Sequence, residues 1–396
     1  MSGVSGRPGA GPSLVLIGGG HSHVEVLRRF GRHAIAGVEL TVISPDRYTP
    51  YSGMLPGYVA GHYSWSDVHI DLARLARSAR ARFIQDGAKG LALRSRTVHC
   101  ESGLAIDWDR LSINVGSTPR PEAPGAAGHA VAVKPIYRFN ERWLALLERV
   151  RRAGGRLRIA VVGGGAGGVE LLLAMQFRLR NECTALGQDA DRLEFMLFSR
   201  GRHILPTHSP RVRLRFQRVL ARRGIALYCD AAVTAVDESG LRTRDGQWHP
   251  ADEVIWVTGA SGPDWLRGSG LALDSLGFIQ IRESLQTITD PDVFAAGDIA
   301  SMVRHPREKA GVIAVRQGPP LAANLRRSLT GRPVRAWHPQ RHWLALISTG
   351  DRYAVASRGS LGIGGRWLWH CKDWIDRRFM RRYRLPGDRT GSGPGT

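Results

Sequence analysis

The chain has 396 residues, of which 43% are hydrophobic, so it is long enough for two or three domains with separate cores. It has no run of the roughly 18 to 20 apolar residues that span a bilayer, and its first 13 residues lack the apolar segment of a signal peptide, so we expect a cytoplasmic protein. The formal net charge is +22, but only four of the 56 basic residues are lysines. GC-rich codon usage and an anionic partner explain such a skew toward arginine equally well, so the charge alone identifies no ligand.

Four cysteines lie far apart in the sequence, at Cys100, Cys183, Cys229 and Cys371. They form no C-x-x-C pair and have no metal-ligand spacing with histidine. We therefore expect neither a metal site nor a disulfide framework.

A glycine-rich turn follows the first apolar run. The predicted strand Leu14 to Ile17 leads into Gly18-Gly19-Gly20, and His21 to Phe30 then shows helical spacing of its apolar residues. A second apolar run, Val38 to Ile43, predicts another strand. A strand, glycine turn, helix and strand within about 30 residues is the setting in which such a turn indicates a dinucleotide site.

The same arrangement recurs later in the chain. A predicted strand at Leu157 to Val162 leads into Gly163-Gly164-Gly165, a helix from about Gly168 to Arg180, and a strand at Leu193 to Phe198. Two such units are far less expected by chance than one.

Glycines are needed in these turns because a pyrophosphate binds where backbone N–H groups converge at a helix start. The second turn has the complete pattern of Gly163, Gly165 and Gly168. The first has Gly18 and Gly20, but His23 occupies the third glycine position. Alone, this first turn is as compatible with an unrelated α/β protein; its context and its repetition favour a nucleotide, with His21 and Ser22 as further contacts.

The acidic residue that commonly binds a ribose after the next strand is missing from both units. The first unit has Ser44-Pro45-Asp46 after its strand, and the second has Ser199-Arg200. Serine and arginine suit a 2′-phosphate better than a free 2′-hydroxyl, which favours NADPH at the second site. In a chain this rich in arginine, chance placement of Arg200 is the alternative.

The order of these units predicts an α/β fold with two Rossmann-like domains, the second inserted in the first. The runs Leu111 to Gly116 and Asp252 to Gly259 predict strands that leave each domain, Pro119 to Pro124 predicts a linker, and Gly259 is a predicted nucleotide contact. We expect a first domain over 14–134 and 269–330, a second over 135–268, and a small α+β region over 331–396. Its end, from Pro386 to Thr396, is predicted to be disordered.

Three segments resemble a known family: IGGGHSHVEVL, SPDRYTPYSGMLPGYVAGHYS and KAGVIAVRQGPPLAANL. Over about residues 14–330 the chain resembles the FAD-dependent pyridine nucleotide-disulfide oxidoreductases, which include type II NADH dehydrogenases and disulfide reductases. Within that family the segments are most similar to the oxidoreductase fused to, or found beside, selenide, water dikinase. That subgroup is itself similar to type II NADH dehydrogenases.

The resemblance implies two cofactors, FAD and NADH or NADPH, and a set of FAD contacts. It implies that Gly18 and Gly20 hold the FAD pyrophosphate, that Asp298 accepts hydrogen bonds from the ribityl and pyrophosphate region, and that Gly297 is a further FAD contact; an N-cap of the following helix is the alternative for Asp298. It also places four residues against the flavin, with an ordinary Pro-Gly loop as the alternative: Pro50, Ser52, Gly53 and Met54.

Three further residues are implied in catalysis. Glu170 matches a glutamate near the flavin and the quinone pocket of type II NADH dehydrogenases, and a proton relay suits quinone reduction. A solvated carboxylate on a helix surface is the alternative. Gln317 matches part of the quinone-contacting segment, and Lys309 is implied near the flavin.

Disulfide reductases pass electrons from the flavin to a Cys-x-x-x-x-Cys pair, and the chain has no such pair. Sulfide oxidation needs two cysteines brought together, for which Cys183 or Cys229 with Cys371 are the candidates; buried unreactive thiols are the alternative. We expect electrons to leave the flavin directly for a diffusible acceptor.

The segment RWLWHCKDWIDRRFMRRYR, from Arg366 to Arg384, predicts a basic amphipathic helix rich in aromatic residues. Tryptophans at headgroup depth and arginines toward anionic lipid are typical of a peripheral membrane contact, here at the inner face of the cell membrane. A helix packed on the flavin domain or on a second copy in a homodimer is the alternative.

Our leading hypothesis is an enzyme that transfers hydride from NAD(P)H to FAD and then two electrons to a quinone-like acceptor. An oxidoreductase of selenium metabolism is the alternative within the fold. A non-catalytic protein that binds nucleic acid or senses flavin is the alternative from another class, but it needs no second dinucleotide site, so we expect no nucleic-acid partner.

Overall fold

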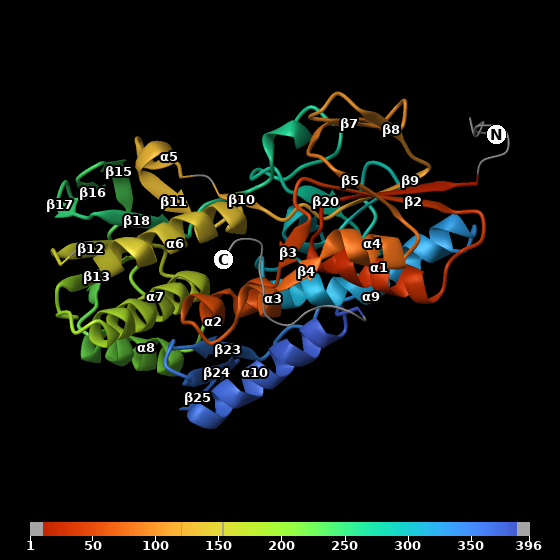
Figure 1. Ribbon diagram of the computed structural model, residues 1–396. Helices are drawn as coiled ribbons and strands as arrows, with labels where there is room; N and C mark the ends of the chain where they lie inside the picture. Colours follow the sequence, from red (N-terminus) through yellow and green to blue (C-terminus); the bar gives the residue numbers. More distant parts are fainter. Residues whose placement is uncertain (1–10, 120, 153, 386–396) are drawn as a thin grey trace.

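The computed structural model describes residues 11–119, 121–152 and 154–385. Two parallel sheets with flanking helices form two lobes, and the C-terminal elements lie along the lower side of both in Figure 1. The expectations for the first ten residues and for Pro386 to Thr396 lie outside the described part of the chain.

The first lobe is built on a parallel sheet of five strands. In spatial order these are β21 (Val293–Ala295), β9 (Arg110–Ile113), β1 (Ser13–Ile17), β2 (Glu39–Ser44) and β5 (Arg82–Gln85). All four pairings are parallel, with Leu14 opposite Leu40 and Ile17 opposite Ile43. Helix α1 (His21–Arg32) packs against α9 (Gly311–Leu329) and α4 (Leu72–Ser78).

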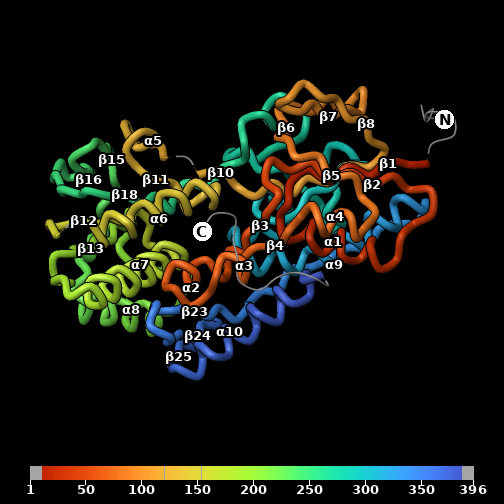
Figure 2. The backbone as a smooth tube through the Cα atoms, in the orientation of Figure 1, coloured from red at the N-terminus to blue at the C-terminus, as the bar shows by residue number. Residues whose placement is uncertain are grey.

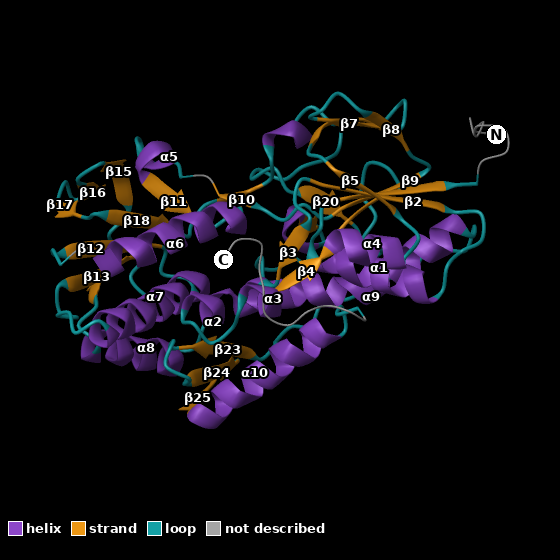
Figure 3. Cartoon of the chain, viewed as in Figure 1, coloured by secondary structure: helices purple, strands orange, loops and turns teal. Residues whose placement is uncertain are grey.

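A second parallel sheet forms the other lobe. In spatial order its strands are β11 (Ala130–Ala132), β18 (Glu253–Trp256), β12 (Leu157–Val162), β13 (Leu193–Phe198) and β14 (Ala226–Tyr228). Its helices are α6 (Ile136–Arg152), α7 (Ala166–Ala185) and α8 (Pro210–Arg222), as Figure 3 shows. Strand β21 completes the first sheet although it follows the whole second sheet in sequence. The predicted α/β fold with an inserted second nucleotide-type lobe is therefore confirmed.

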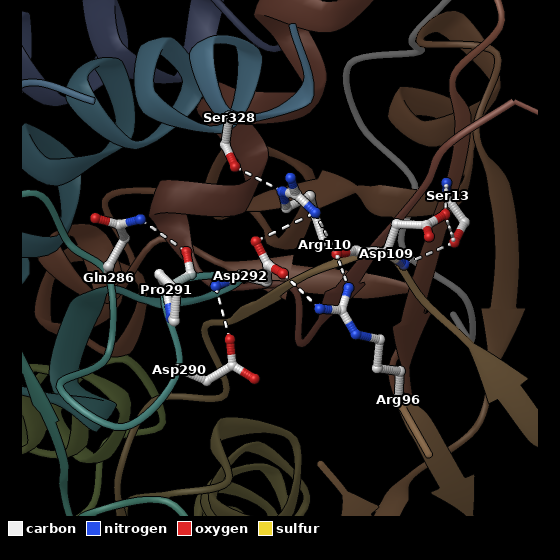
Figure 4. A network of polar contacts seen from close by, with 9 residues as sticks. All are labelled: Ser13, Arg96, Asp109, Arg110, Gln286, Asp290, Pro291, Asp292 and Ser328. Carbon is white, nitrogen blue, oxygen red and sulfur yellow. Dashed lines mark hydrogen bonds and ion pairs between the residues drawn. The ribbon is translucent and has the colours of Figure 1, made fainter. Parts of the chain in front are cut away.

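Polar contacts hold the returning segment to the first sheet (Figure 4). Asp292, just before β21, forms ion pairs with Arg96 at 2.6 Å and with Arg110 of β9 at 3.2 Å. Arg110 also donates to the hydroxyl of Ser328 in α9 at 2.6 Å. The loops that contain Arg96 and Asp292, strand β9 and helix α9 are distant in sequence but meet at this edge of the sheet.

Smaller sheets and helices complete the two lobes and the crossing between them. Three short antiparallel sheets are β6 (Ala88–Ala92), β7 (Thr97–Cys100) and β8 (Ala105–Asp107); β15 (Val233–Asp237), β16 (Gly240–Thr243) and β17 (Trp248–Pro250); and β3 (Tyr48–Pro50) with β4 (His69–Asp71). The pair β10 (Thr118–Pro119) and β19 (Ala260–Ser261) joins the two crossing segments, and β20 (Ile279–Ile281) pairs with β22 (Ala300–Met302). The short helices are α2 (Leu55–Val59), α3 (Trp65–Val68) and α5 (Ala126–His129).

Three predicted boundaries were wrong. The predicted exit strands extend to Gly116 and Gly259, but β9 ends at Ile113 and β18 at Trp256. Both glycines have a positive φ, +76° and +77°, which is incompatible with an extended strand. The predicted linker begins within β10, because the crossing segments pair with each other there.

The C-terminal region is a three-stranded antiparallel sheet followed by one long helix. Its elements are β23 (Ala345–Ser348), β24 (Ala354–Arg358), β25 (Leu361–Gly365) and α10 (Arg366–Arg381), the blue elements of Figure 2. The expected small α+β region is thus present. Its helix joins the core of the first lobe through Phe379 and Met380. Among the described residues, no helix is both long and apolar enough to cross a membrane.

Candidate active site

The first glycine-rich loop connects β1 to α1 and has no room for larger residues. Gly18 has a φ of +92°, and a Cβ atom at Gly20 would lie 2.3 Å from Oδ1 of Asn114. The same Oδ1 atom accepts hydrogen bonds from the backbone amides of Ser22 (3.1 Å) and His23 (3.3 Å). The sequence analysis missed Asn114, which lies in the loop after β9 and fixes the start of α1.

His23 occupies the third glycine position of this loop and fills the space there with a hydrogen-bonded side chain. Its Nδ1 atom lies 2.7 Å from the carbonyl oxygen of Gly18, and its Nε2 atom lies 2.8 Å from the hydroxyl of Ser112. In the second loop, a Cβ atom at the equivalent Gly168 would lie only 2.0 Å from the carbonyl oxygen of Gly163. Burial lowers the pKa of His23 to about 4, so a neutral imidazole fills the space.

His21 supplies a test of whether this site fits FAD. Its Nε2 atom is buried and has no hydrogen-bond partner among the described residues. Burial lowers the pKa of His21 to about 4, although the nearby Asp298 opposes that shift. A neutral imidazole with an unused polar atom, at the start of a helix whose loop excludes side chains, fits a nucleotide phosphate or hydroxyl group.

The predicted contacts after β2 lie beside the same loop. The hydroxyl oxygen of Ser44 is 3.5 Å from the Cβ position of Gly19, and it donates to the carbonyl of Asp46 at 3.0 Å. Burial raises the pKa of Asp46. An acidic residue is therefore present near the first loop, two residues beyond the position at which we expected it. The hydroxyl of Ser22 is instead buried in a hydrogen bond to the carbonyl of Ala314 at 2.6 Å.

Asp298 lies in a short 3-10 helix, Gly297–Ile299, and forms a 2.7 Å ion pair with Lys134. The alternative that it caps the following helix was wrong, because α9 begins only at Gly311 and its N-cap is Ala310. Lys134 comes from the segment that crosses between the lobes. The sequence analysis missed Lys134, although it is one of only four lysines.

Lys309 and Gln317 line one cavity together with Gly297 and Asp298. The Oε1 atom of Gln317 accepts a hydrogen bond from the amide of Gly297 at 2.6 Å, so this side chain is buried and held in place. The ammonium group of Lys309 donates to the carbonyl of Ala300 at 2.6 Å. Burial lowers the pKa of Lys309 to about 8, so it can release a proton near neutral pH.

The predicted flavin-facing segment runs from Pro50 at the end of β3 through a short 3-10 helix, Ser52–Met54. Met54 is buried, and Ser52 lies next to Gly311 at the start of α9. The carbonyl oxygen of Gly53 accepts a hydrogen bond from the ammonium group of Lys372 at 2.7 Å. Helix α10 therefore reaches the segment that the resemblance assigns to the flavin.

Lys372 belongs to a buried group of charged side chains around Glu170. It forms a 2.8 Å ion pair with Asp376, one turn along α10. Burial opposes the charge of Lys372, but Asp376 and Glu170 outweigh it and raise the pKa of the lysine. Burial raises the pKa of Glu170, and Lys372 opposes that shift. Tyr51 hydrogen bonds to Asp376, which links this charged cluster to the flavin-facing segment.

Glu170 is held by the C-terminal sheet. Its Oε1 atom accepts a hydrogen bond from the amide of Ser348 in β23 at 2.8 Å. The alternative of a solvated surface carboxylate was therefore wrong, because β23 and α10 cover this part of α7. Lys372 and Asp376 were not predicted as site residues, although packing of α10 on the flavin domain was one of the alternatives; the lone lysine among its arginines was the available signal.

The second loop brings together the residues predicted for NAD(P)H. Gly163 has a φ of +141°, and its Cβ position is 2.9 Å from the side chain of Thr258, directly before Gly259. Ser199 is buried, with its hydroxyl oxygen 2.5 Å from the Cβ position of Gly164. Arg200 is exposed. Strand ends β13 and β18 thus place Ser199 and Thr258 on either side of the loop.

All four cysteines are free thiols, with Cys100 and Cys183 buried. They are distributed over β7, α7, the end of β14 and α10. No pair of cysteines forms a disulfide in the described chain.

A family model for pyridine nucleotide-disulphide oxidoreductases matches residues 12–324, which includes both glycine-rich loops and the Asp298 segment. The chain belongs to the pyridine nucleotide-disulphide oxidoreductase family. Among curated relatives, demethylphylloquinone reductase NdbB of Synechocystis is 26% identical over 71% of this chain and 68% of its own length. A type II NADH:quinone oxidoreductase of Staphylococcus epidermidis is 20% identical over 94% of this chain and 96% of its own length.

Solved structures of this family share the fold over nearly the whole chain. The sulfide:quinone oxidoreductase of Aquifex aeolicus superposes with a TM-score of 0.79 at 18% identity, covering 94% of this chain and 91% of its own. NDH2 of Plasmodium falciparum, solved in complex with NADH, gives 0.78 at 14% identity, with coverages of 94% and 97%. At these identities the likeness concerns the fold alone, and it extends through the C-terminal region.

Proposed function

We propose that this protein is an FAD-dependent NADH dehydrogenase that reduces a quinone. The observation that carries the proposal is the contact of Lys372, which is paired with Asp376, with the carbonyl oxygen of Gly53 in the predicted flavin-facing segment. FAD, when bound there, accepts a hydride from NADH and passes two electrons to an acceptor. The names of the curated relatives, which include NADH:quinone and demethylphylloquinone reductases, support this assignment.

The protein's own part is to bind the two nucleotides and to supply protons. The loop from Gly18 to His21 would hold the FAD pyrophosphate, and the loop from Gly163 to Gly168 would hold that of NADH. Quinone reduction needs two protons in a site shielded from water. Glu170 and Lys372 would provide them, since burial favours the neutral acid at Glu170 while Lys372 stays charged beside Asp376.

Anaerobic titration of the purified protein with NADH and with NADPH, while the flavin spectrum is recorded, tests the first half of the reaction. We expect bleaching of the flavin by NADH and rapid recovery on adding a water-soluble quinone. A purified protein that is colourless and takes up no FAD would contradict the proposal. So would a reduced flavin that quinones reoxidise no faster than oxygen does.

A selenium compound is the second candidate acceptor, because the three quoted segments resemble the oxidoreductase associated with selenide, water dikinase. The same reduced protein can be mixed with oxidised selenium compounds in place of the quinone. Faster reoxidation by selenium compounds than by any quinone would favour this second function.

We also propose that α10 touches the membrane surface. Its inner face is packed against the protein, whereas Trp367 and Trp374 are 62% and 53% exposed, with Ile375 beside them. Tryptophan is favoured at the depth of lipid headgroups. Replacing both tryptophans with serine should reduce vesicle binding and leave activity with a soluble quinone unchanged. A homodimer through this face is the alternative; sedimentation of the lipid-free protein as a dimer would favour it.

A further inference from the structure

A groove lined with arginines lies between α8 and the edge strand β25. One wall is a stripe on α8 that consists of Arg211, Arg215, Arg218 and Arg222, with Arg223 just after the helix. These four helix positions are separated by four, three and four residues, so their side chains share one face over about 16 Å. The opposite wall contains Thr349, Asp351, Tyr353 and Gly362.

The groove has a large excess of positive charge. Its single acidic residue, Asp351, already pairs with Arg223 at 2.7 Å. The guanidinium of Arg215 donates to the hydroxyl of Tyr353 at 3.0 Å, which fixes its position but leaves its charge uncompensated. Within the described residues, neither Arg218 nor Arg222 forms an ion pair, and the same holds for Arg211. Like charges at this spacing on a helix are unfavourable, so the groove is suited to an anion.

Some arginines elsewhere are neutralised by carboxylates, as at Arg28 with Glu25 (2.7 Å) and Arg142 with Glu253 (2.6 Å). Others, such as Arg94 and Arg244, are exposed and form no ion pair within the described residues, but they lie in separate turns. The α8 stripe differs because its arginines are aligned on one helix face, opposite two hydroxyl groups, a glycine and one carboxylate that is already paired. Gly362 has no room for a side chain, since its Cβ position lies 2.7 Å from the side chain of Val212.

The edge strand β25 connects this groove to an exposed apolar surface. Side chains alternate along a strand, so Gly362 and Gly364 face α8 while Leu361 and Ile363 face the other way. Leu361 and Ile363 are 48% and 40% exposed, on an edge strand that no other strand covers in the described chain. Leu214, within the groove lining, is 47% exposed. The exposed Leu214 beside unpaired arginines, with Leu361 and Ile363 on the opposite face of the edge strand, matches the two parts of a lipid, its acyl region and its headgroup.

We propose that the groove between α8 and β25 binds the phosphate group of an anionic phospholipid. Arg218 and Arg222, one turn apart on α8, would bind the phosphate oxygens, because a guanidinium donates paired hydrogen bonds to phosphate. Leu361 and Ile363 would rest at the lipid surface together with Trp367 and Trp374. The proposal rests on the membrane contact proposed above, but it adds a defined headgroup site between α8 of the second lobe and the C-terminal sheet.

Vesicle co-sedimentation of the FAD-loaded protein tests this site. The vesicles contain phosphatidylcholine alone or with phosphatidylglycerol. The test variant is R218Q/R222Q. The control is R94Q/R244Q, which removes the same charge at two exposed arginines, in the turns after β6 and β16, that form no ion pair within the described residues and do not line the groove. Flavin content and the thermal unfolding midpoint establish that each variant is folded.

We expect the wild type and the control to bind phosphatidylglycerol vesicles and to bind phosphatidylcholine weakly. Each basic side chain at an anionic surface strengthens binding roughly fivefold, so R218Q/R222Q should bind about 25-fold more weakly. R218K/R222K should recover only part of the binding, since it restores the charge but not the paired hydrogen bonds of the guanidinium groups. Soluble quinone reduction should be unchanged in all variants, so that loss of lipid binding is distinguishable from failure of the proposed enzymatic function.

Several outcomes would overturn the proposal. Equal vesicle binding by R218Q/R222Q and the control would show that the groove is not the lipid site. Equal binding to vesicles with and without phosphatidylglycerol would exclude a preference for a headgroup with net negative charge. Binding of soluble glycerol phosphate with the same arginine dependence, but no binding to vesicles, would assign the groove to a free phosphate. Tighter, arginine-dependent binding of RNA would assign it to nucleic acid.

Discussion

The ammonium group of Lys372 in α10 lies 2.7 Å from the carbonyl oxygen of Gly53, more than 300 residues earlier in the chain. This contact places a buried cation from the C-terminal helix against the predicted flavin-facing segment. Tyr51 strengthens the connection, since it hydrogen bonds to Asp376 and stacks on Phe379 with ring centroids 4.3 Å apart. The C-terminal helix therefore forms part of the candidate active site.

Replacing Lys372 with methionine should slow quinone reduction about 100-fold, a usual loss when a proton donor is removed. Flavin reduction by NADH should change little, because the second glycine-rich loop is untouched. Stopped-flow measurement of the two half-reactions separates these effects. The matched control is R378M, which removes a cation from the exposed side of the same helix. Equal slowing of both half-reactions in K372M would indicate a structural defect instead.

Glu170 should give quinone reduction a pH dependence. Burial raises the pKa of this carboxyl group, so the protonated form persists above the usual carboxyl range of about 4.3. If the protonated form is the donor, the rate is highest below that pKa and falls as the pH rises through it. We expect E170Q to be slow at every pH and to lose this dependence. A wild-type profile retained in E170Q would assign the titration to another group, such as Lys309.

The strands and glycine-rich turns that occur in both lobes were predictable because each depends on a short stretch of sequence. Apolar periodicity and the spacing of Gly163, Gly165 and Gly168 located the strands, the turns and the order of the two lobes. The strand ends were predicted less well, since a strand stops where neighbours and φ angles require it, as at Gly116 and Gly259.

The candidate site was predicted only in part, because much of it depends on contacts between distant segments. Asn114, Lys134 and Lys372 each join elements from different parts of the chain, and none stands in a recognisable motif. The amphipathic pattern of α10 did not show which face of the helix packs against the rest of the protein. The folded chain buries Phe379 and leaves Trp367 exposed.

His23 should make stability depend on pH in the mildly acidic range. Its pKa falls from about 6.5 in the unfolded chain to about 4 in the folded protein. A lowered histidine pKa means that the folded state binds fewer protons, so stability is fully present above pH 6.5 and is lost as the pH falls toward 4. The shift corresponds to about 3 kcal/mol over that range.

Urea unfolding of the wild type and of H23N at several pH values between 4 and 7 measures this contribution. We expect H23N to be less stable at pH 7, because Gly18 and Ser112 lose their imidazole contacts, and to show a shallower decline with acidification. H99Q, at an exposed position of β7, is the control. Parallel stability curves for H23N and the wild type would show that His23 is not the titrating group; His21, with a similarly lowered pKa, would then be the next candidate.

Arg200 provides the last test, which concerns the choice between NADH and NADPH. Strand β13 ends at Phe198, and Ser199 then lies against Gly164 where an acidic residue would otherwise bind a ribose diol. Because residue 199 is a serine, it has no carboxylate that would repel a 2′-phosphate. The exposed Arg200 follows directly in the sequence. If Arg200 binds that phosphate, R200A should raise the KM for NADPH at least tenfold and leave the KM for NADH unchanged. R94A controls for the loss of one positive charge.

S199D should act in the opposite sense, because its carboxylate would accept hydrogen bonds from a free ribose and repel the phosphate. Steady-state kinetics with both nucleotides decide the matter: if R200A changes neither KM, Arg200 does not bind the 2′-phosphate, and its place reflects the composition of the chain.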